Sequence, residues 1–203
     1  MTKLTDCKYR IGLTGTLDDS KTHKLVLQGL FGTVNRVVST KQLIDKKQLA
    51  QLKVMCLNLK YPEVEAKKVY GVKYFEELEF LTQNTARNKY IRNLALALKG
   101  NTLLLFQLVE KHGEILFNLI KEKADQKRKV FFVFGGTDTD DREQIRAITE
   151  REENAIIVAS YGTFSTGINI RNLHNIVFSS PTKSPIRVLQ SIGRGLRVDD
   201  KKD

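Results

Sequence analysis

The feature that most constrains the fold of this 203-residue chain is a set of short apolar runs in its second half, each followed by a segment with helical spacing. The runs occupy residues 102–106, 129–134, 155–159 and 175–178. Their length fits strands, and their nearly unbroken apolar character is typical of strands buried on both faces. Strands that alternate with helices in this way predict an α/β fold, a doubly wound parallel sheet with right-handed crossovers and helices on both faces.

The helices between and after these strands are expected at 109–120, 138–153 and 186–197. Each carries apolar side chains about three and four residues apart, which places them on one face. In a doubly wound sheet, ligands bind at the carboxyl ends of the strands. The loops that follow the four strands are therefore the first places in which to look for functional residues.

The first half of the chain has a less regular pattern. Residues 9–17 predict a short strand that ends in a turn, and the helix after it is expected to end at Gly32. Residues 51–59 alternate apolar and polar side chains, which predicts a strand with one solvated face. Two further helices are expected at 75–81 and 86–98, with Asn84 or Thr85 as the cap between them.

The break between the first strand–helix unit and the rest falls near residues 31–39. We therefore divide the chain into residues 1–32, the end of one domain, and residues 33–203, a second domain. A length of 203 residues fits one ordinary domain and part of another.

Composition narrows the class of protein. Lysine and arginine number 34 against 23 acidic residues, so the formal net charge is +11, and such a chain tends to bind polyanions. The two cysteines, Cys7 and Cys56, have no spacing typical of a disulfide framework or a metal site. No segment approaches the roughly 20 apolar residues that cross a bilayer. We expect a cytoplasmic protein with no membrane partner (host cytoplasm if the protein is viral).

Two of the strand-end loops are rich in small or hydroxyl residues. Gly135 and Gly136 precede a helix, where glycines let a ligand approach the backbone, although a plain capped turn gives the same pattern. Residues 160–169 include Ser160 and Thr163, whose hydroxyls suit sugar–phosphate oxygens. An ordinary polar loop is the alternative in this case.

The last helix carries Arg194 and Arg197, three residues apart and so on one helical face. Two guanidinium groups placed in this way can neutralise a phosphoryl group during transfer. Two solvated arginines near a helix C-terminus are the alternative interpretation. The three histidines are scattered, and His112 and His174 are more typical of surface or loop positions than of ligands; we expect no metal site formed by protein side chains.

In chain order, these segments resemble the motifs of superfamily 2 DNA helicases. The matching segments are 13–17 for motif III, 103–116 for motif IV, 134–136 for motif IVa, 160–169 for motif V and 190–197 for motif VI. The chain resembles in particular the T4-type bacteriophage helicases that remodel branched DNA and R-loops. That resemblance implies a RecA-like fold and the second, C-terminal motor domain of an ATP-dependent helicase that acts in recombination, repair and replication restart.

The resemblance also implies roles for single residues. Arg194 and Arg197 would reach the ATP phosphates as the catalytic arginines. The residues implied to bind or couple the nucleotide are Thr14, Gly167, Asn169 and Gln190. Those implied to contact the phosphate backbone of DNA are Gly135, Gly136, Ser160 and Thr163. Asn169 stands where relatives often have aspartate.

Two helicase motifs are missing from the sequence: the G-x-x-x-x-G-K-[ST] loop that holds phosphates and the Asp-Glu box that holds magnesium. Both belong to the first RecA-like domain of such enzymes. We therefore expect a fragment whose partners are that first domain, single-stranded or branched DNA, and RNA–DNA hybrids. ATP and Mg²⁺ would be held mainly by the first domain, and this chain alone should not hydrolyse ATP.

Two other classes of protein remain open. One is a non-catalytic nucleic-acid-binding domain with a RecA-like shape, which would have no need for Arg194 and Arg197 at their spacing. The other is a small-molecule α/β enzyme such as a transferase. That class needs a catalytic acid, base or nucleophile in the strand-end loops, and none is convincing.

Overall fold

A computed structural model of the protein describes residues 7–14, 21–35, 37–166 and 170–199. Its centre is a four-stranded parallel sheet with the strand order β2-β3-β1-β4. The strands are β1 (Thr102–Phe106), β2 (Val130–Val133), β3 (Ile156–Ser160) and β4 (Asn175–Phe178). These are the four apolar runs of the sequence, so the predicted parallel α/β sheet is confirmed.

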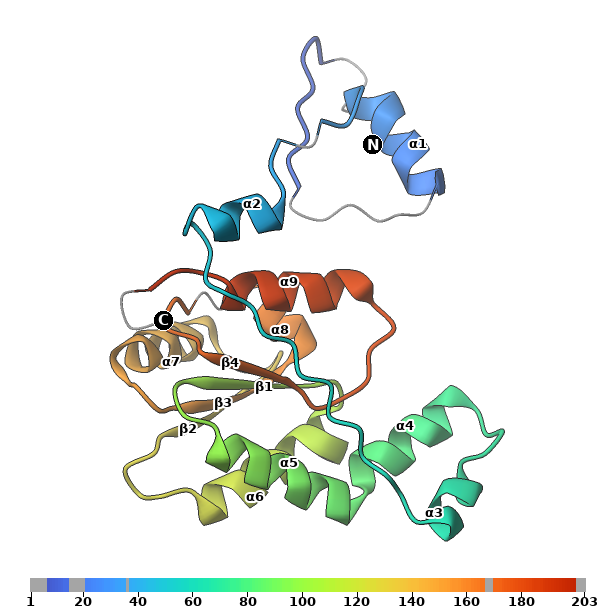
Figure 1. The fold of residues 1–203 in the computed structure, drawn as a ribbon, viewed down its shortest axis with the longest axis vertical. Helices are drawn as coiled ribbons and strands as arrows, with labels where there is room; N and C mark the ends of the chain where they lie inside the picture. The colour runs from blue at the N-terminus through green and yellow to red at the C-terminus, as the bar shows by residue number, and fades with distance from the viewer. Residues whose placement is uncertain (1–6, 15–20, 36, 167–169, 200–203) are drawn as a thin grey trace.

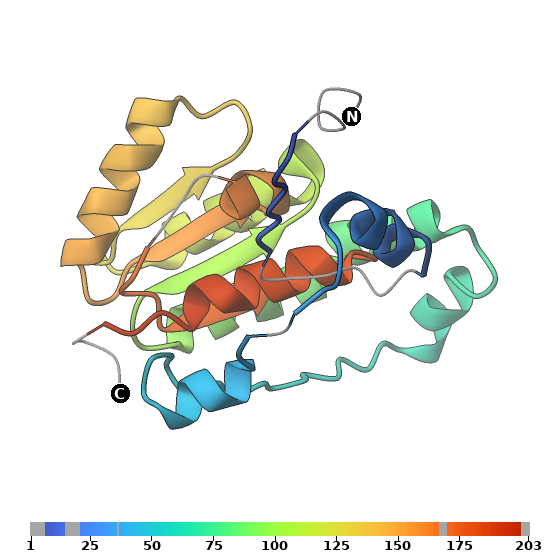
Figure 2. The same ribbon diagram turned by 90° about the horizontal axis from the view of Figure 1, so that it is seen from above.

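Helices cover both faces of the sheet (Figure 1). The helices on one face are α7 (Thr139–Arg151), α8 (Tyr161–Thr166) and α9 (Pro185–Gly195), and those on the other are α5 (Thr85–Ala97) and α6 (Glu114–Lys123). Figure 2 looks onto the first of these faces. Because side chains alternate along a strand, β1 sends Leu103 and Leu105 into one core and Leu104 and Phe106 into the other.

The three longer helices of the first half were also predicted, within a residue or two, whereas two short ones at 40–45 and 63–68 were not. Helix α1 (Lys21–Phe31) ends at Gly32, whose φ of +84° is the left-handed conformation that glycine tolerates. Helices α4 (Tyr74–Gln83) and α5 meet at Asn84, whose side chain accepts a hydrogen bond of 2.9 Å from the backbone N–H of Arg87.

Three shorter elements complete the described chain: α2 (Thr40–Asp45), α3 (Glu63–Lys68) and a π-helical turn, η2 (Val109–Gly113), which leads directly into α6. Ser39 caps α2 by accepting a hydrogen bond from the N–H of Gln42, while the Gln42 side chain accepts one from the N–H of Ser39.

Two predicted strands are wrong. Residues 51–59 are extended but join no sheet, and Val54 is 70% exposed. This segment runs past the β4 side of the molecule between α2 and α3 (Figures 1 and 2). Residues 9–14, the described part of the predicted strand 9–17, are also irregular, and Leu13 is 94% exposed. In both places the apolar pattern of a strand is present, but neither segment belongs to the four-stranded sheet of the described residues.

Candidate functional site

The loops after the four strands gather at one edge of the sheet because all four strands run in the same direction (Figure 1). Four of the residues expected to contact nucleic acid lie in or at these loops: Gly135, Gly136, Ser160 and Thr163. The fold therefore brings together two segments that are more than 20 residues apart in sequence, one after β2 and one after β3.

The turn after β2 presents exposed backbone at Gly135 and Gly136. A Cβ atom on Gly136 would lie 2.7 Å from the ring of Phe134, so a larger residue there would have to displace that ring. The Thr137 hydroxyl accepts a hydrogen bond of 3.1 Å from the N–H of Phe134, and Arg142 donates to the carbonyl oxygen of Gly135 at 3.0 Å. These two hydrogen bonds stabilise the turn, and its two glycines remain exposed to solvent.

Ser160 and Thr163 are buried, with 9% and 5% of their surface exposed. Their hydroxyl oxygens lie 2.8 Å apart, and the backbone N–H of Thr163 donates to the Ser160 hydroxyl at 3.3 Å. The two side chains therefore hold the chain as it leaves β3 and enters α8. A direct contact of these hydroxyls with phosphate stays a prediction.

The two arginines of the last helix lie at its C-terminal end. Arg194 is in the last turn of α9, whereas Arg197 lies two residues beyond Gly195, so the prediction that one helix includes both arginines is wrong. Arg194 is half-buried, and burial together with the positive charge of Arg197 lowers its pKa. The two guanidinium groups are therefore close enough to repel each other. Gln190 is exposed on the same helix.

Helix α9 is held against the sheet near this arginine pair. A Cβ atom on Gly195 would lie 2.6 Å from Cδ1 of Ile176 in β4. The carbonyl oxygen of Leu196 accepts a hydrogen bond of 2.8 Å from the N–H of Ala50, which ties the end of the helix to the extended segment. These contacts fix the position from which Arg194 projects.

The other residues expected to couple the nucleotide do not lie with the arginine pair in the described structure. Thr14 is exposed in the irregular segment 7–14, which Figure 1 shows beyond α9 and away from the sheet. Gly167 and Asn169 lie outside the described residues. The roles of all three stay predictions.

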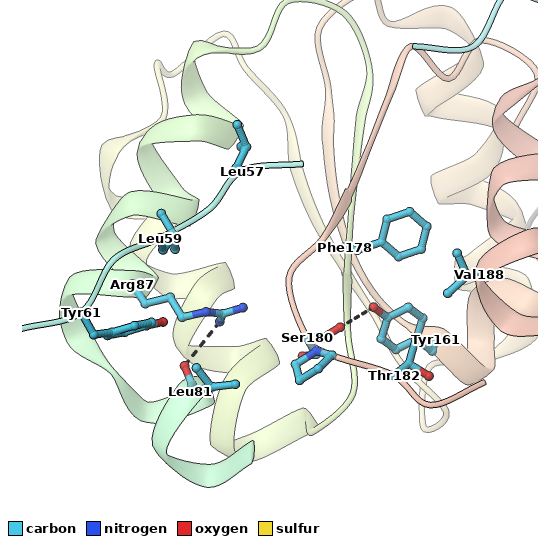
Figure 3. A pocket seen from close by; sticks show the side chains of 11 residues that line it. Leu57, Leu59, Tyr61, Leu81, Arg87, Tyr161, Phe178, Ser180, Thr182 and Val188 are labelled. Carbon is cyan, nitrogen blue, oxygen red and sulfur yellow. Dashed lines mark hydrogen bonds between the residues drawn. The ribbon is translucent and has the colours of Figure 1, made fainter. Parts of the chain in front are cut away.

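A groove of about 430 Å³ opens at the carboxyl edge of the sheet, between the α4–α5 layer and α9 (Figure 3). Arg87 lies on one side of it, where it donates to the carbonyl oxygens of Ser179 at 2.6 Å and Leu81 at 3.3 Å. Tyr161 lies on the other side and donates to the carbonyl oxygen of Ser180 at 2.6 Å. Burial lowers the pKa of Arg87 and raises that of Tyr161.

Sequence reasoning missed this groove. Its lining residues come from the extended segment, α4, α5, β4, α8 and α9, so no short motif contains them. The apolar residues at 57, 59 and 61 were the available signal, but they were interpreted as part of a strand or left unassigned. The groove matters because ligands in parallel α/β sheets bind at this edge.

His112, expected at a surface or loop position, lies in the interior of the protein. It is fully buried, with Nδ1 2.9 Å from the Ser180 hydroxyl and Nε2 3.2 Å from Oδ1 of Asn88. Burial, with a smaller contribution from the charge of Arg87, lowers the pKa of His112 to about 3. The histidine is therefore neutral and joins η2, α5 and the loop after β4.

The chemistry of the described residues fits phosphate rather than a metal ion. Arg194 and Arg197 offer guanidinium groups, whose planar donors match phosphate oxygens. Within the described ranges, no three His, Cys, Asp or Glu side chains gather where they could hold a metal. No helix in the described part of the chain is long and apolar enough to cross a membrane.

Comparisons with known proteins agree with this geometry. The chain is 39% identical over 202 residues to the ATP-dependent DNA helicase UvsW of Enterobacteria phage T4, a match that covers 98% of this chain and 39% of the T4 protein. It is 26% identical over 166 residues to a Saccharomyces cerevisiae protein named, provisionally, as an ATP-dependent helicase; that match covers 80% of this chain and 24% of the yeast protein.

The crystal structure of T4 UvsW matches with a TM-score of 0.58 and 42% sequence identity, over 66% of this chain and 27% of that one. The chain thus spans well under half the length of the relatives it matches. The family model of the helicase conserved C-terminal domain matches residues 86–199, from the start of α5 to the arginine pair. The RecA-like fold expected from the motifs is therefore confirmed, and the chain belongs to the helicase conserved C-terminal domain family.

Proposed function

We propose that this chain is the C-terminal motor domain of an ATP-dependent DNA helicase and acts with a first RecA-like domain that holds ATP and Mg²⁺. The observation that carries the proposal is the Arg194–Arg197 pair. Arg194 lies in the last turn of α9 and Arg197 just beyond it, at the end of a helix that packs against β4, and the charge of Arg197 contributes to lowering the pKa of Arg194.

Guanidinium groups present planar donors that match phosphate oxygens, so a nucleotide phosphate bound on the facing domain is a suitable ligand for this pair. The charge that develops on a transferring phosphoryl group would strengthen the interaction. Arg194 is the better candidate for this contact because it is fixed within α9, whereas Arg197 lies beyond the last turn.

The segment before α1 supports the expected division after Gly32. Its apolar side chains are almost fully exposed, with Ile11 at 83% and Leu13 at 94%. Apolar side chains exposed in a strand-like pattern form a surface that another sheet would cover. We propose that residues 7–14 pack with the first domain and that Thr14 takes part in coupling there.

The carboxyl edge of the sheet supports a nucleic-acid contact. The exposed backbone at Gly135 and Gly136 lets a phosphate approach closely, and the net charge of +11 favours a polyanion. Contacts to the sugar–phosphate backbone carry no sequence information, which suits a protein that moves along DNA of any sequence. Branched DNA and RNA–DNA hybrids, met in recombination, repair and replication restart, are the substrates that we propose.

The test uses a polypeptide that joins this chain to a first RecA-like domain, and it measures ATP hydrolysis with single-stranded, forked and R-loop DNA. Arg194→Ala should abolish hydrolysis but leave DNA binding intact. The control is Arg187→Ala, an exposed arginine on the same helix, which should change neither. If Arg194→Ala hydrolyses ATP like the parent while both bind DNA, the non-catalytic nucleic-acid-binding interpretation is correct instead.

A further inference from the structure

Two exposed aromatic rings at the start of α4, beside the carboxyl edge of the sheet, each have a lysine over them. Nζ of Lys183 lies 3.9 Å from the ring centroid of Tyr74, and Nζ of Lys111 lies 5.9 Å from that of Phe75. Tyr74 is 37% exposed and Phe75 is 57% exposed. We infer that Tyr74 and Phe75 form a stacking surface for the bases of single-stranded DNA, with Lys111 and Lys183 placed to contact its phosphates.

The position of this surface ties it to the proposed function, on which the inference rests. Lys111 lies in η2, which follows β1, and Lys183 lies in the loop that follows β4. β1 and β4 are neighbours in the sheet, so both lysines come from its carboxyl edge. Lys183 directly follows Thr182, which lines the groove of Figure 3, so the Tyr74 ring beneath Lys183 lies near that groove.

Exposure on one helix does not by itself make an aromatic residue a binding residue. Here the chain places a lysine from a different loop over each of two consecutive rings, so rings and charges alternate over a short distance. Single-stranded nucleic acid has the matching pattern, because each flat base is followed by a phosphate. A protein partner has no reason to require that alternation.

The lysines do not block the rings. An exposed cation–π contact contributes about two- to fivefold to an equilibrium constant, whereas stacking of a base on an aromatic ring contributes about five- to 150-fold. A base can therefore displace Lys183 from the face of Tyr74, and the freed ammonium group can then contact the adjacent phosphate. Lys111 lies farther from its ring, at 5.9 Å, and pairs with Glu79 at 2.7 Å, so much of the Phe75 ring, which is 57% exposed, stays open to a base.

The test compares two fluorescent probes of equal length, an oligo-dT of 12 nucleotides and a 12-unit abasic strand, bound to the 203-residue chain at low salt. The measured quantity is the ratio of the Kd for the abasic strand to the Kd for oligo-dT. Phosphate contacts affect both probes, so this ratio isolates stacking. We expect a ratio of about tenfold or more for the parent chain.

The variant Tyr74→Leu/Phe75→Leu keeps apolar volume but removes both rings, and its ratio should fall close to one, mainly because oligo-dT binds more weakly. Tyr74→Phe should keep the ratio of the parent. Tyr90→Ala, which removes a ring of similar exposure (40%) on α5, is the control and should also keep it. Lys111→Gln/Lys183→Gln should weaken both probes and lower their salt dependence.

A ratio near one for the parent chain overturns the inference, and so does an unchanged ratio in the double leucine variant when circular dichroism shows it folded. Neither result touches the proposed motor function, which depends on Arg194 and ATP hydrolysis. The opposite outcome is also distinguishable. If the Kd ratio falls close to one in the double leucine variant while ATP hydrolysis does not depend on Arg194, the stacking surface is supported and the motor function is contradicted.

Discussion

The hydroxyl of Ser180 lies 2.9 Å from Nδ1 of His112, and this contact fixes the tautomer of a fully buried histidine. The Ser180 oxygen already accepts a hydrogen bond of 3.2 Å from the N–H of Gln107, so its own hydrogen is available to donate to Nδ1. Nε2 then carries the proton and donates to Oδ1 of Asn88 at 3.2 Å. The neutral ring thereby joins the ends of β1 and β4 to α5.

A pH dependence of stability follows from this arrangement. The pKa of His112 falls from 6.5 to about 3 on folding, so between these values the unfolded chain binds a proton that the folded chain does not. Stability is therefore complete above about pH 6.5 and decreases as the pH falls, by about 1.4 kcal/mol per pH unit. We expect urea unfolding at pH 5 to show about 2 kcal/mol less stability than at pH 7.

His112→Gln tests that assignment because glutamine does not titrate. The variant should be less stable than the parent at pH 7 but show a flatter dependence between pH 6.5 and pH 5. Glu79 and Glu143 also have lowered pKa values, from side-chain hydrogen bonds to Lys111 and Arg146, but they titrate below 4.5 and outside this window. An unchanged slope in the variant would assign the pH dependence to another group.

Asn101 joins the amino-terminal ends of the strands and should be sensitive to substitution. Its fully buried side chain donates to the carbonyl oxygens of Thr149, Glu152 and Asn172 at 2.8 to 3.0 Å and accepts from the N–H of Ala155 at 2.8 Å.

Asn101→Leu removes these hydrogen bonds and leaves the buried N–H of Ala155 without its acceptor, so it should lower the free energy of unfolding by about 3 kcal/mol or more. Asn93→Leu, at an exposed position of α5, should change it by less than about 0.5 kcal/mol. The comparison is made by denaturant unfolding at pH 7, and equal effects of the two substitutions would contradict the role given to Asn101.

Substitution of two glycines by alanine should change the stability of the fold in opposite directions. Gly100 has a φ of +83°, and a Cβ atom there would lie 2.6 Å from Cγ of His174, so Gly100→Ala should destabilise the fold by about 2 kcal/mol. Gly193 lies within α9, and a Cβ atom there would meet nothing within 4 Å beyond the backbone of its own helix. Gly193→Ala should therefore stabilise by about 0.5 kcal/mol, measured as a rise in Tm.

Binding of single strands by the chain alone should be weak and sensitive to salt because the net charge is +11. If four phosphates are neutralised, a rise from 50 mM to 200 mM NaCl should weaken binding about 50-fold. Fluorescence anisotropy with a labelled oligo-dT measures this directly. Affinity that stays constant over that range would mean that lysine–phosphate contacts do not drive binding.

The sheet could be predicted from sequence because its strands are short apolar runs, and the two central ones, β1 and β3, are buried on both faces. A run such as Leu103 to Phe106 has few other stable arrangements, and helical spacing then fixes what lies between the runs. The strand predicted at 51–59 was wrong because alternating apolar and polar residues indicate only an extended chain with one solvated side. This pattern does not show whether a neighbouring strand is available to pair with it.

The site was less predictable because most of it is assembled from distant residues. Arg194 was proposed from motif VI, which is short and local, and its role stays a prediction. The helix was expected to include Arg197 but ends at Gly195. His112 carried no local sign of burial, since it lies in a polar stretch that includes the exposed Lys111 and Glu114. The groove residues Tyr61, Arg87 and Tyr161 lie on three separate segments, and only tertiary packing brings them together.

The most direct test of the account is the kcat for ATP hydrolysis, with saturating single-stranded DNA, by this chain joined to a first RecA-like domain. An arginine that stabilises the charge of phosphoryl transfer contributes on the order of 10³-fold or more to kcat. We predict a loss of that size in Arg194→Ala and a kcat within about twofold of the parent in Arg187→Ala. Equal kcat values in Arg194→Ala and the parent would contradict the motor function.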